Sequence, residues 1–192
     1  MLDIIGALLL LPIVIVLTVI IAPIIWLTDR GPIFYNAMRI GKGGKPFKMF
    51  KFRSMYVNSS DIRNADGSTY NSDYDPRVTP VGRILRKTSL DEFPQVLNVL
   101  IGDMSFVGPR PTVGTIDPDT FVGDRKKRYS VKPGITGYSQ ALFRNSISME
   151  EKFRLDVYYV DNMSFPLDMR ILWQTLISVI KRRNINHEQI MK

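Results

Sequence analysis

Two adjacent acidic residues, Asp91 and Glu92, are the strongest candidates for chemistry in this sequence. They stand just before Phe93-Pro94, where an apolar helix is predicted to begin, so they lie at the positive end of its dipole. Neighbouring side chains point in different directions, so one carboxylate can face a reacting atom while the other serves a second reactant or a metal ion. The structural alternative is helix capping, because acids are common in first turns and Ser89 with Glu92 fits a capping box.

Positively charged residues are available on several separate predicted elements, namely Lys51, Arg53, Arg110 and Arg144. Lys51 and Arg53 alternate on a strand predicted over residues 47–55, so their side chains are expected on one face. Arg110 stands between two prolines, which restrain its backbone. Cations from separate elements are what the stabilisation of a multiply charged phosphate requires. The pattern therefore indicates phosphoryl transfer.

The length, charge and composition of the chain limit its domain number, its partners and the chemistry that it can perform. The 192 residues are enough for one compact domain with an appendage. Lys and Arg (26) exceed Asp and Glu (18), and the net charge of +8 suits anionic partners such as anionic membrane lipid or nucleotides. The sequence has no cysteine, which excludes disulfides and thiol nucleophiles. It also lacks the recognition-helix and aromatic patterns of nucleic-acid-binding modules, so no nucleic acid partner is expected.

The N-terminal segment is predicted to enter a membrane. Residues 4–28 carry no charge, and a helix of that length reaches about 37 Å, beyond the ~30 Å hydrocarbon core. The chain therefore divides into a membrane segment, residues 1–29, and a cytosolic domain, residues 30–192. Pro12 and Pro23 predict a bend, so the segment either crosses the bilayer or re-enters on the same side. The basic residues that follow it place this flank in the cytoplasm.

The cytosolic part is predicted to be α+β, mainly helical with a small sheet. Helices are expected to start at Thr79-Pro80 and Phe93-Pro94, and the capping box from Ser148 predicts a helix through Asp161. A short strand is expected over residues 138–142. The charge run over residues 124–128 fits a solvated face, with contact to lipid head groups as the alternative.

Six sequence blocks carry a resemblance to a known family: Lys51-Phe52-Arg53-Ser54-Met55, Thr88-Ser89-Leu90-Asp91-Glu92 with Pro94-Gln95, Leu97-Asn98-Val99-Leu100, Gly102-Asp103-Met104-Ser105 with Gly108-Pro109-Arg110-Pro111, Pro133-Gly134-Ile135-Thr136-Gly137, and Asp156-Val157-Tyr158-Tyr159. In this order they resemble the monotopic bacterial sugar transferases. These phosphoglycosyl transferases move a sugar phosphate from a nucleotide sugar to polyprenol phosphate. The resemblance covers nearly the whole chain.

The resemblance implies an enzyme that uses covalent catalysis to start the synthesis of a glycan. It also implies that a re-entrant membrane helix anchors this enzyme at the cytoplasmic face of the bacterial inner membrane. Asp91 would attack the sugar-bearing phosphorus of a UDP-sugar, and Glu92 would deprotonate the incoming undecaprenyl or other polyprenol phosphate. Mg²⁺ near Asp91 would neutralise the diphosphate. By the same resemblance, Lys51, Arg110 and Arg144 would contact phosphate or nucleotide. Arg53 is predicted to bind phosphate because it stands beside Lys51 on the predicted strand.

The alternative function is a membrane-anchored basic regulator that binds nucleotide or nucleic acid without turnover. The chain also departs from the family pattern at Phe143, where glycine is usual, and at Leu11 and Ala22, where serine usually precedes the proline. The sequence leaves open which sugar is carried and whether the protein forms a homodimer.

Overall fold

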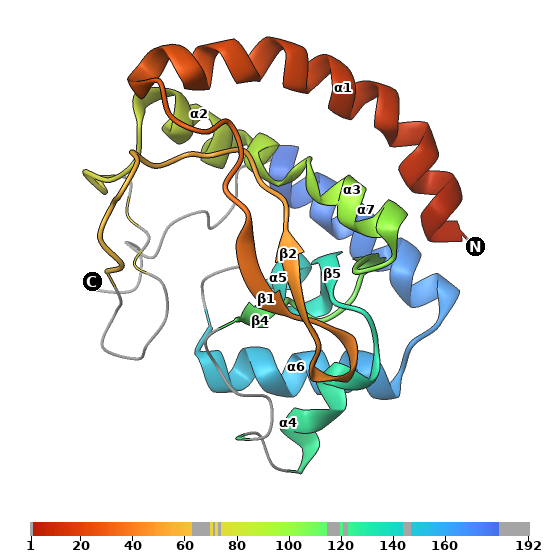
Figure 1. Ribbon diagram of the computed structural model, residues 1–192. Helices are drawn as coiled ribbons and strands as arrows, with labels where there is room; N and C mark the ends of the chain where they lie inside the picture. Colours follow the sequence, from red (N-terminus) through yellow and green to blue (C-terminus); the bar gives the residue numbers. More distant parts are fainter. Residues whose placement is uncertain are drawn as a thin grey trace.

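The computed structural model describes residues 2–62, 70, 72, 74–114, 120, 123–143 and 147–180. These residues form an α+β fold, as predicted (Figure 1). The α-helices are α1 (Leu2–Asp29), α2 (Pro80–Thr88), α3 (Gln95–Ile101), α4 (Asp124–Lys127), α5 (Tyr138–Leu142), α6 (Met149–Asp161) and α7 (Phe165–Ile180). The strands are β1 (Ala37–Ile40), β2 (Pro46–Met49), β3 (Ser105–Val107), β4 (Thr112–Val113) and β5 (Gly134–Thr136). Short 3-10 helices are η1 (Lys42–Gly44), η2 (Leu90–Glu92) and η4 (Arg128–Ser130).

Two small sheets form the β part of the fold. The first has the order β2-β1-β4 and is antiparallel, with Ala37 of β1 opposite Met49 of β2. The second is the parallel pair β3 and β5, with Ser105 opposite Gly134. A Cβ on Gly134 would lie 2.2 Å from the backbone nitrogen of Gly108, so glycine permits this close approach. The segment that starts at Gly108 therefore lies directly against β5.

Helix α1 packs on the domain through one face. Its buried residues are Ala7, Val14, Ile21 and Ile25, spaced by seven, seven and four positions. Their neighbours in the core include Val96 and Val99 of α3 and Leu85 of α2. The other faces of α1 expose large aliphatic side chains. Among the described residues, α1 is the one helix that is long and apolar enough to cross a membrane.

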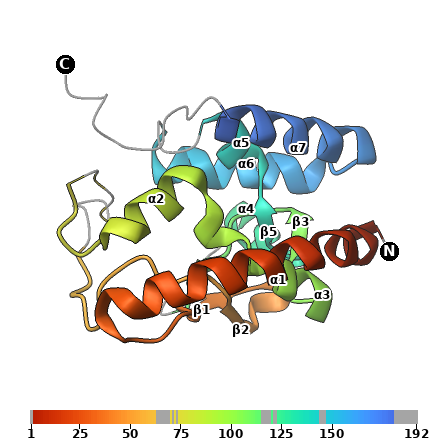
Figure 2. The ribbon, with the colours of Figure 1, turned by 90° about the horizontal axis from the view of Figure 1, so that it is seen from above.

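The bend predicted for the membrane segment takes the form of curvature within one helix. Pro12 and Pro23 both lie inside α1, which is uninterrupted from Leu2 to Asp29. A proline removes one helical hydrogen bond and presses on the preceding turn, which bends a helix. Figure 1 shows α1 curving over one end of the molecule, with α4 and α6 at the opposite end. Figure 2, viewed from above, shows α1 on one side and α6 with α7 on the other.

Both ends of α1 are bonded to the domain. Near the N-terminal end, the Asp3 carboxylate accepts hydrogen bonds from the Ser105 hydroxyl (3.0 Å) and the Phe106 N–H (3.1 Å). At the other end, the Asp29 carboxylate pairs with both terminal nitrogens of Arg53. The helix is therefore held along its length by apolar packing and at each end by a carboxylate.

Helices α2, α3 and α6 begin close to the predicted positions. The Thr79 hydroxyl caps α2 by accepting from the Gly82 N–H (2.9 Å), and the Ser148 hydroxyl caps α6 by accepting from the Glu151 N–H (3.2 Å). Gly102, with φ 91°, ends α3. These boundaries depend on local chemistry, which is why they could be predicted.

The short strand predicted over residues 138–142 is wrong, because these residues form helix α5. The strand lies just before it, in β5, where residues 134–136 pair with β3. A short apolar run does not distinguish strand from helix, and pairing with a segment distant in sequence decides between them. Residue 137 then serves as the N-cap of α5.

The charge run predicted to be a solvated face forms α4 and the start of η4. Arg125 and Lys127 pair with Glu150 and Asp161 of α6 at 3.3 Å each. Figure 1 shows α4 at the end of the molecule remote from α1. The alternative of contact between this run and lipid head groups is therefore not supported by its position.

Candidate active site

Asp91 and Glu92 lie in η2, within the sharp connection between α2 and α3. Ser89 makes the turn possible with a left-handed backbone conformation, φ 58°. Its side chain makes no capping hydrogen bond, so the predicted capping box between Ser89 and Glu92 is wrong. The structural explanation for the acidic pair as part of a helix cap is thereby removed.

The buried side chain of Asn98 fixes the segment that carries Lys51. Its carbonyl oxygen accepts from the Phe50 N–H (2.9 Å), and its amide nitrogen donates to the Lys48 carbonyl (2.7 Å). These bonds satisfy backbone groups where the chain leaves β2 and hold them against α3. Lys51 therefore follows from an anchored strand end.

Three of the predicted site residues meet at the Glu92 carboxylate. The Lys51 ammonium nitrogen lies 2.6 Å from Oε1 of Glu92, and Nη2 of Arg110 lies 3.9 Å from the same oxygen. Lys51 and Glu92 are half-buried, whereas the Arg110 side chain is 54% exposed. The site thus combines a fixed ion pair with a guanidinium that is open to a ligand.

Asp91 is buried, with 9% of its surface exposed. Burial raises its pKa to about 6 because the charged carboxylate is poorly solvated, and the negative charge of Glu92 acts in the same direction. The positive charges of Lys51 and Arg86 oppose this rise. Asp91 is therefore a weakly solvated carboxylate that is ionised above about pH 6.

Arg86 belongs to this site and was missed by the sequence reasoning. It lies in the last turn of α2, and its Nε donates to the Ser54 hydroxyl at 2.9 Å. Its charge interacts with that of Asp91, five positions later in the chain. The signal available in the sequence was a cation on the helix that immediately precedes the acidic pair. The sequence alone does not show that the Arg86 side chain lies near Asp91, because this depends on the turn at Ser89.

Arg53 has a different role from the one predicted. Strand β2 ends at Met49, so the alternation expected to place Lys51 and Arg53 on one face does not continue. The Arg53 guanidinium is buried and bonded to Asp29 and to the Pro32 carbonyl. It therefore joins the end of α1 to the domain, and its donors are already engaged. Arg144, the other predicted phosphate contact, lies outside the described residues.

The backbone around Arg110 is fixed by β5. The Gly108 N–H donates to the Thr136 carbonyl (2.9 Å), and the Gly134 N–H donates to the Pro109 carbonyl (3.0 Å). A Cβ on Gly108 would lie 2.5 Å from the Lys132 carbonyl, so the segment passes too close to its neighbour for a larger residue. Arg110 thus extends from a firmly held turn.

A comparison with known families identifies the class to which this arrangement belongs. The model of the family described as bacterial sugar transferase matches residues 1–182. The chain belongs to the bacterial sugar transferase family. The family resemblance predicted from the sequence blocks is confirmed.

Relatives of this chain include proteins that are named as sugar-phosphate transferases. It is 46% identical over 154 residues to the uncharacterized sugar transferase EpsL of Bacillus subtilis, covering 80% of this chain and 73% of that protein. It is 39% identical over 165 residues to the undecaprenyl-phosphate galactose phosphotransferase of Salmonella typhimurium, covering 80% and 34%. It is 38% identical over 181 residues to the UDP-glucose:undecaprenyl-phosphate glucose-1-phosphate transferase of Klebsiella pneumoniae, covering 91% and 38%. The chain therefore spans little more than a third of the last two relatives.

The acidic pair of this sugar transferase has the donor chemistry that Mg²⁺ requires. Mg²⁺ is commonly bound by one or two carboxylates, with substrate phosphates and water completing its shell. Asp91 and Glu92 supply hard oxygen ligands of this kind. Within the described part of the chain, no group of three or more acidic, His or Cys side chains could hold an ion alone. The residues thus fit a metal that is shared with a phosphorylated substrate.

Proposed function

We propose that this protein is a phosphoglycosyl transferase that moves a sugar 1-phosphate from a UDP-sugar to undecaprenyl phosphate or another polyprenol phosphate. The observation that carries the proposal is the buried Asp91 beside Glu92, with Lys51, Arg86 and Arg110 contributed from three different segments. The names of the Salmonella and Klebsiella relatives support the substrate classes. The sugar differs between those two names, so no sugar is assigned to this chain.

In the first step, a carboxylate oxygen of Asp91 attacks the phosphorus that carries the sugar. An O–P bond forms at Asp91, the bond from that phosphorus to the bridging oxygen breaks, and UMP leaves with that oxygen. The product on the enzyme is an acyl phosphate that carries the sugar. Desolvation of the Asp91 carboxylate favours its attack, because little water must be removed from it. Arg110 is open to the diphosphate and would offset the charge that develops there.

In the second step, a phosphate oxygen of the polyprenol phosphate attacks the phosphosugar and releases Asp91. Glu92 accepts the proton that the acceptor phosphate loses, and the adjacent position of the two acids serves these two separate tasks. Lys51, 2.6 Å from Glu92, fixes the orientation of the base. Asp91 would hold Mg²⁺ together with the diphosphate of the substrate, and the metal would supply charge neutralisation during transfer.

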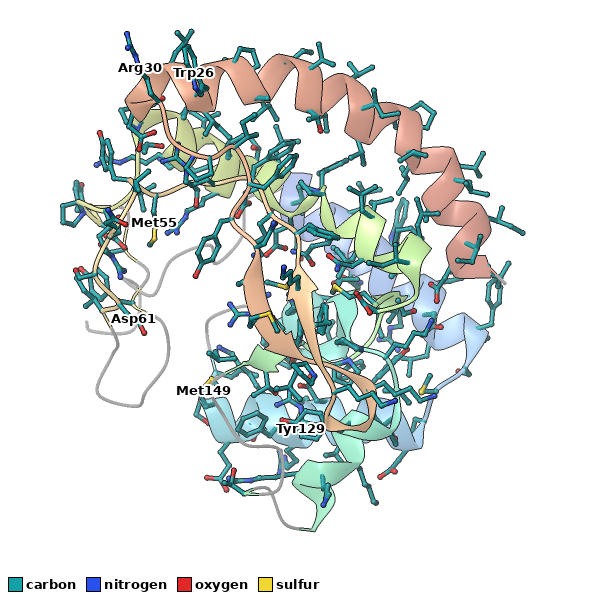
Figure 3. The ribbon with its side chains drawn as sticks, in the orientation of Figure 1. Trp26, Arg30, Met55, Asp61, Tyr129 and Met149 are labelled. Atoms are coloured by element: carbon teal, nitrogen blue, oxygen red, sulfur yellow. The ribbon has the colours of Figure 1, made fainter. Side chains whose placement is uncertain are left out.

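The attachment of α1 supports re-entry into the membrane rather than crossing. A helix of 28 residues would be about 42 Å long, yet its N-terminal and C-terminal carboxylates both bond to the same domain. A domain on one side of the bilayer can bind both ends only if both ends lie on that side. Figure 3 shows Trp26 and Arg30 directed away from the domain at the C-terminal end of α1, a pairing suited to the membrane interface. We further propose that the domain lies at the cytoplasmic face of the inner membrane, against anionic lipid, because basic residues follow α1 in the sequence.

The half-reactions test the proposal separately. Purified full-length protein in nanodiscs is mixed with Mg²⁺ and a panel of UDP-sugars, first without and then with undecaprenyl phosphate. Without acceptor, we expect a burst of at most one UMP per enzyme and a phosphosugar adduct in the intact mass; acceptor then permits turnover. Asp91→Asn should lose both the burst and turnover, and Glu92→Gln should keep the burst and lose turnover. The control is Asp161→Asn, at an exposed acid of α6. Binding of UDP-sugars without UMP release from any of them would favour the regulator instead.

A further inference from the structure

A second pair of charges is buried next to the segment that carries Arg110. Nη2 of Arg128, at the start of η4, lies 2.7 Å from Oδ2 of Asp156 in α6, and their side chains are 4% and 2% exposed. Apolar side chains of similar volume often stabilise a fold as well as a buried ion pair does. Stability alone therefore does not require charged residues at these positions, and the hydrogen bonds that the pair makes to its neighbours are the relevant property.

Arg128 bonds directly to the backbone of Arg110. Its Nη2 donates to the Arg110 carbonyl at 2.7 Å as well as to Asp156. Its guanidinium carbon lies 4.6 Å from the centre of the Phe153 ring, which holds the plane of the guanidinium. The next residue, Tyr129, labelled in Figure 3, donates to the Thr112 hydroxyl at 3.0 Å. Segment 128–129 thus holds the Arg110 turn at two points.

Asp156 extends the network to α5. Its second oxygen, Oδ1, accepts a hydrogen bond from the Ser139 hydroxyl at 3.1 Å. One carboxylate therefore joins α6, α5 and, through Arg128, the turn of Arg110. Burial of a carboxylate is costly unless charged or polar groups bind its oxygens, and Arg128 and Ser139 bind both oxygens of Asp156.

We propose that Arg128 and Asp156 are positioning residues that act on phosphosugar transfer through Arg110. The prolines on either side of Arg110 leave the turn few degrees of freedom, and the bond from Arg128 fixes the peptide plane that follows Arg110. This sets the origin of an exposed side chain whose guanidinium must meet a phosphate beside Glu92. Displacement by about 1 Å at such a position lowers a rate by about 100-fold. The inference rests on the proposed function, because it assigns Arg110 to the substrate phosphate.

The test replaces the pair without leaving a buried charge. The double variant Arg128→Met with Asp156→Leu keeps apolar volume, and we expect its melting temperature to stay within a few degrees of the parent. We expect its UMP burst to reach the same amplitude at a rate about 10- to 100-fold lower, because Asp91 is intact but the phosphate is poorly held. The matched control is Lys127→Met with Asp161→Leu, which removes an exposed ion pair between α4 and α6. The control should keep the parent rate.

A double-mutant cycle with Arg110→Ala decides whether the pair acts through Arg110. If it does, the double variant adds no further loss once the Arg110 guanidinium is gone. Losses that multiply would show an independent structural effect and overturn the proposal, as would a folded double variant with the parent rate. Arg128→Lys gives the same cycle should the double variant unfold, because the shorter lysine side chain does not bring a nitrogen to the position of Nη2 and has no planar group to stack on Phe153. Failure of the parent to release UMP would instead refute the proposed function.

Discussion

The backbone N–H of Phe52 donates a 3.0 Å hydrogen bond to the carbonyl of Asp91. This bond joins the segment that carries Lys51 to the turn that carries both carboxylates, across about forty residues of sequence. Phe52 is itself buried in the core beneath α1. The relative positions of cation and acids are therefore determined by the same packing that seats the membrane helix.

Replacement of Lys51 should impair the reaction rather than the fold. Lys51→Met removes the charge 2.6 Å from Glu92, and we expect UMP turnover to fall about 10- to 100-fold because the base loses its orienting partner. Steady-state UMP release measures the effect. Lys48→Met, an exposed lysine on the same segment, is the control. Equal turnover in both variants would remove Lys51 from the site.

Replacement of Arg53 should lower the stability of the fold and leave the reaction unchanged. Arg53→Met leaves the Asp29 carboxylate without its main partner and detaches the end of α1, which should lower the free energy of unfolding by about 2 kcal/mol. The burst amplitude per folded enzyme should be unchanged. Thermal denaturation and burst analysis of the same sample separate the two effects. A variant of parent stability that has lost its burst would restore Arg53 as a phosphate ligand.

The pKa of Asp91 makes stability depend on pH. Because burial raises this pKa to about 6, the folded protein binds the Asp91 proton more tightly than the unfolded chain does. The stabilising effect of protonation is fully present below about pH 4 and is lost as pH rises through about 6. Over this window the parent should lose on the order of 3 kcal/mol relative to Asp91→Asn, following the shift from 3.8. Parallel denaturation curves at pH 4 and pH 7 measure the difference.

The same group predicts the pH profile of the burst. In the proposed mechanism the ionised form of Asp91 is the nucleophile, so the burst rate should rise as pH increases through about 6 and then level off. A burst rate that stays constant from pH 5 to pH 8, with the protein folded throughout, would contradict this assignment.

Asn98 should be needed for both stability and activity. Asn98→Leu leaves the Phe50 N–H and the Lys48 carbonyl without their buried partner, at a cost of about 2 to 4 kcal/mol. Turnover should fall as well, because Lys51 follows this anchored segment. Ile101→Ala, a truncation of an exposed residue on the same helix, is the control. Denaturant unfolding should show the loss for Asn98→Leu alone.

Cysteine labelling tests the seating of α1. The sequence contains no native cysteine, so Leu2→Cys and Arg30→Cys each introduce a single thiol. In vesicles with the domain outside, both thiols should react with an impermeant maleimide, because both ends of α1 are bonded to that domain. Protection of the thiol at position 2 alone would show that the helix crosses the bilayer.

The sequence was most informative where chemistry is local. Thr79 and Ser148 predicted helix starts because a cap needs only its own first turn, and the uncharged N-terminal run predicted α1 by length alone. Lys51 and Arg110 were predicted, with Arg53 and Arg144, as cations that stabilise a phosphate near the acidic pair of Asp91 and Glu92. The structure brings Lys51, Glu92 and Arg110 together.

The misses concern residues whose role depends on contacts distant in sequence. Arg53 was grouped with Lys51 on the assumption of a longer strand, but β2 ends early and the two side chains diverge. Asp156 belongs to a block that carries the family resemblance, but its burial and its pairing with Arg128 become evident only in the structure. Asn98 stands in an apolar run, where nothing in the sequence shows which backbone groups it will satisfy.

The four buried residues of α1 make this apolar helix a structural part of the domain as well as a candidate membrane anchor. Without it, the apolar side chains of Val96, Val99 and Leu85 would lose the cover of Ala7, Val14 and Ile21. We therefore expect the domain to fold stably only when α1 is present. A fragment that lacks α1 would expose these apolar side chains to water and aggregate.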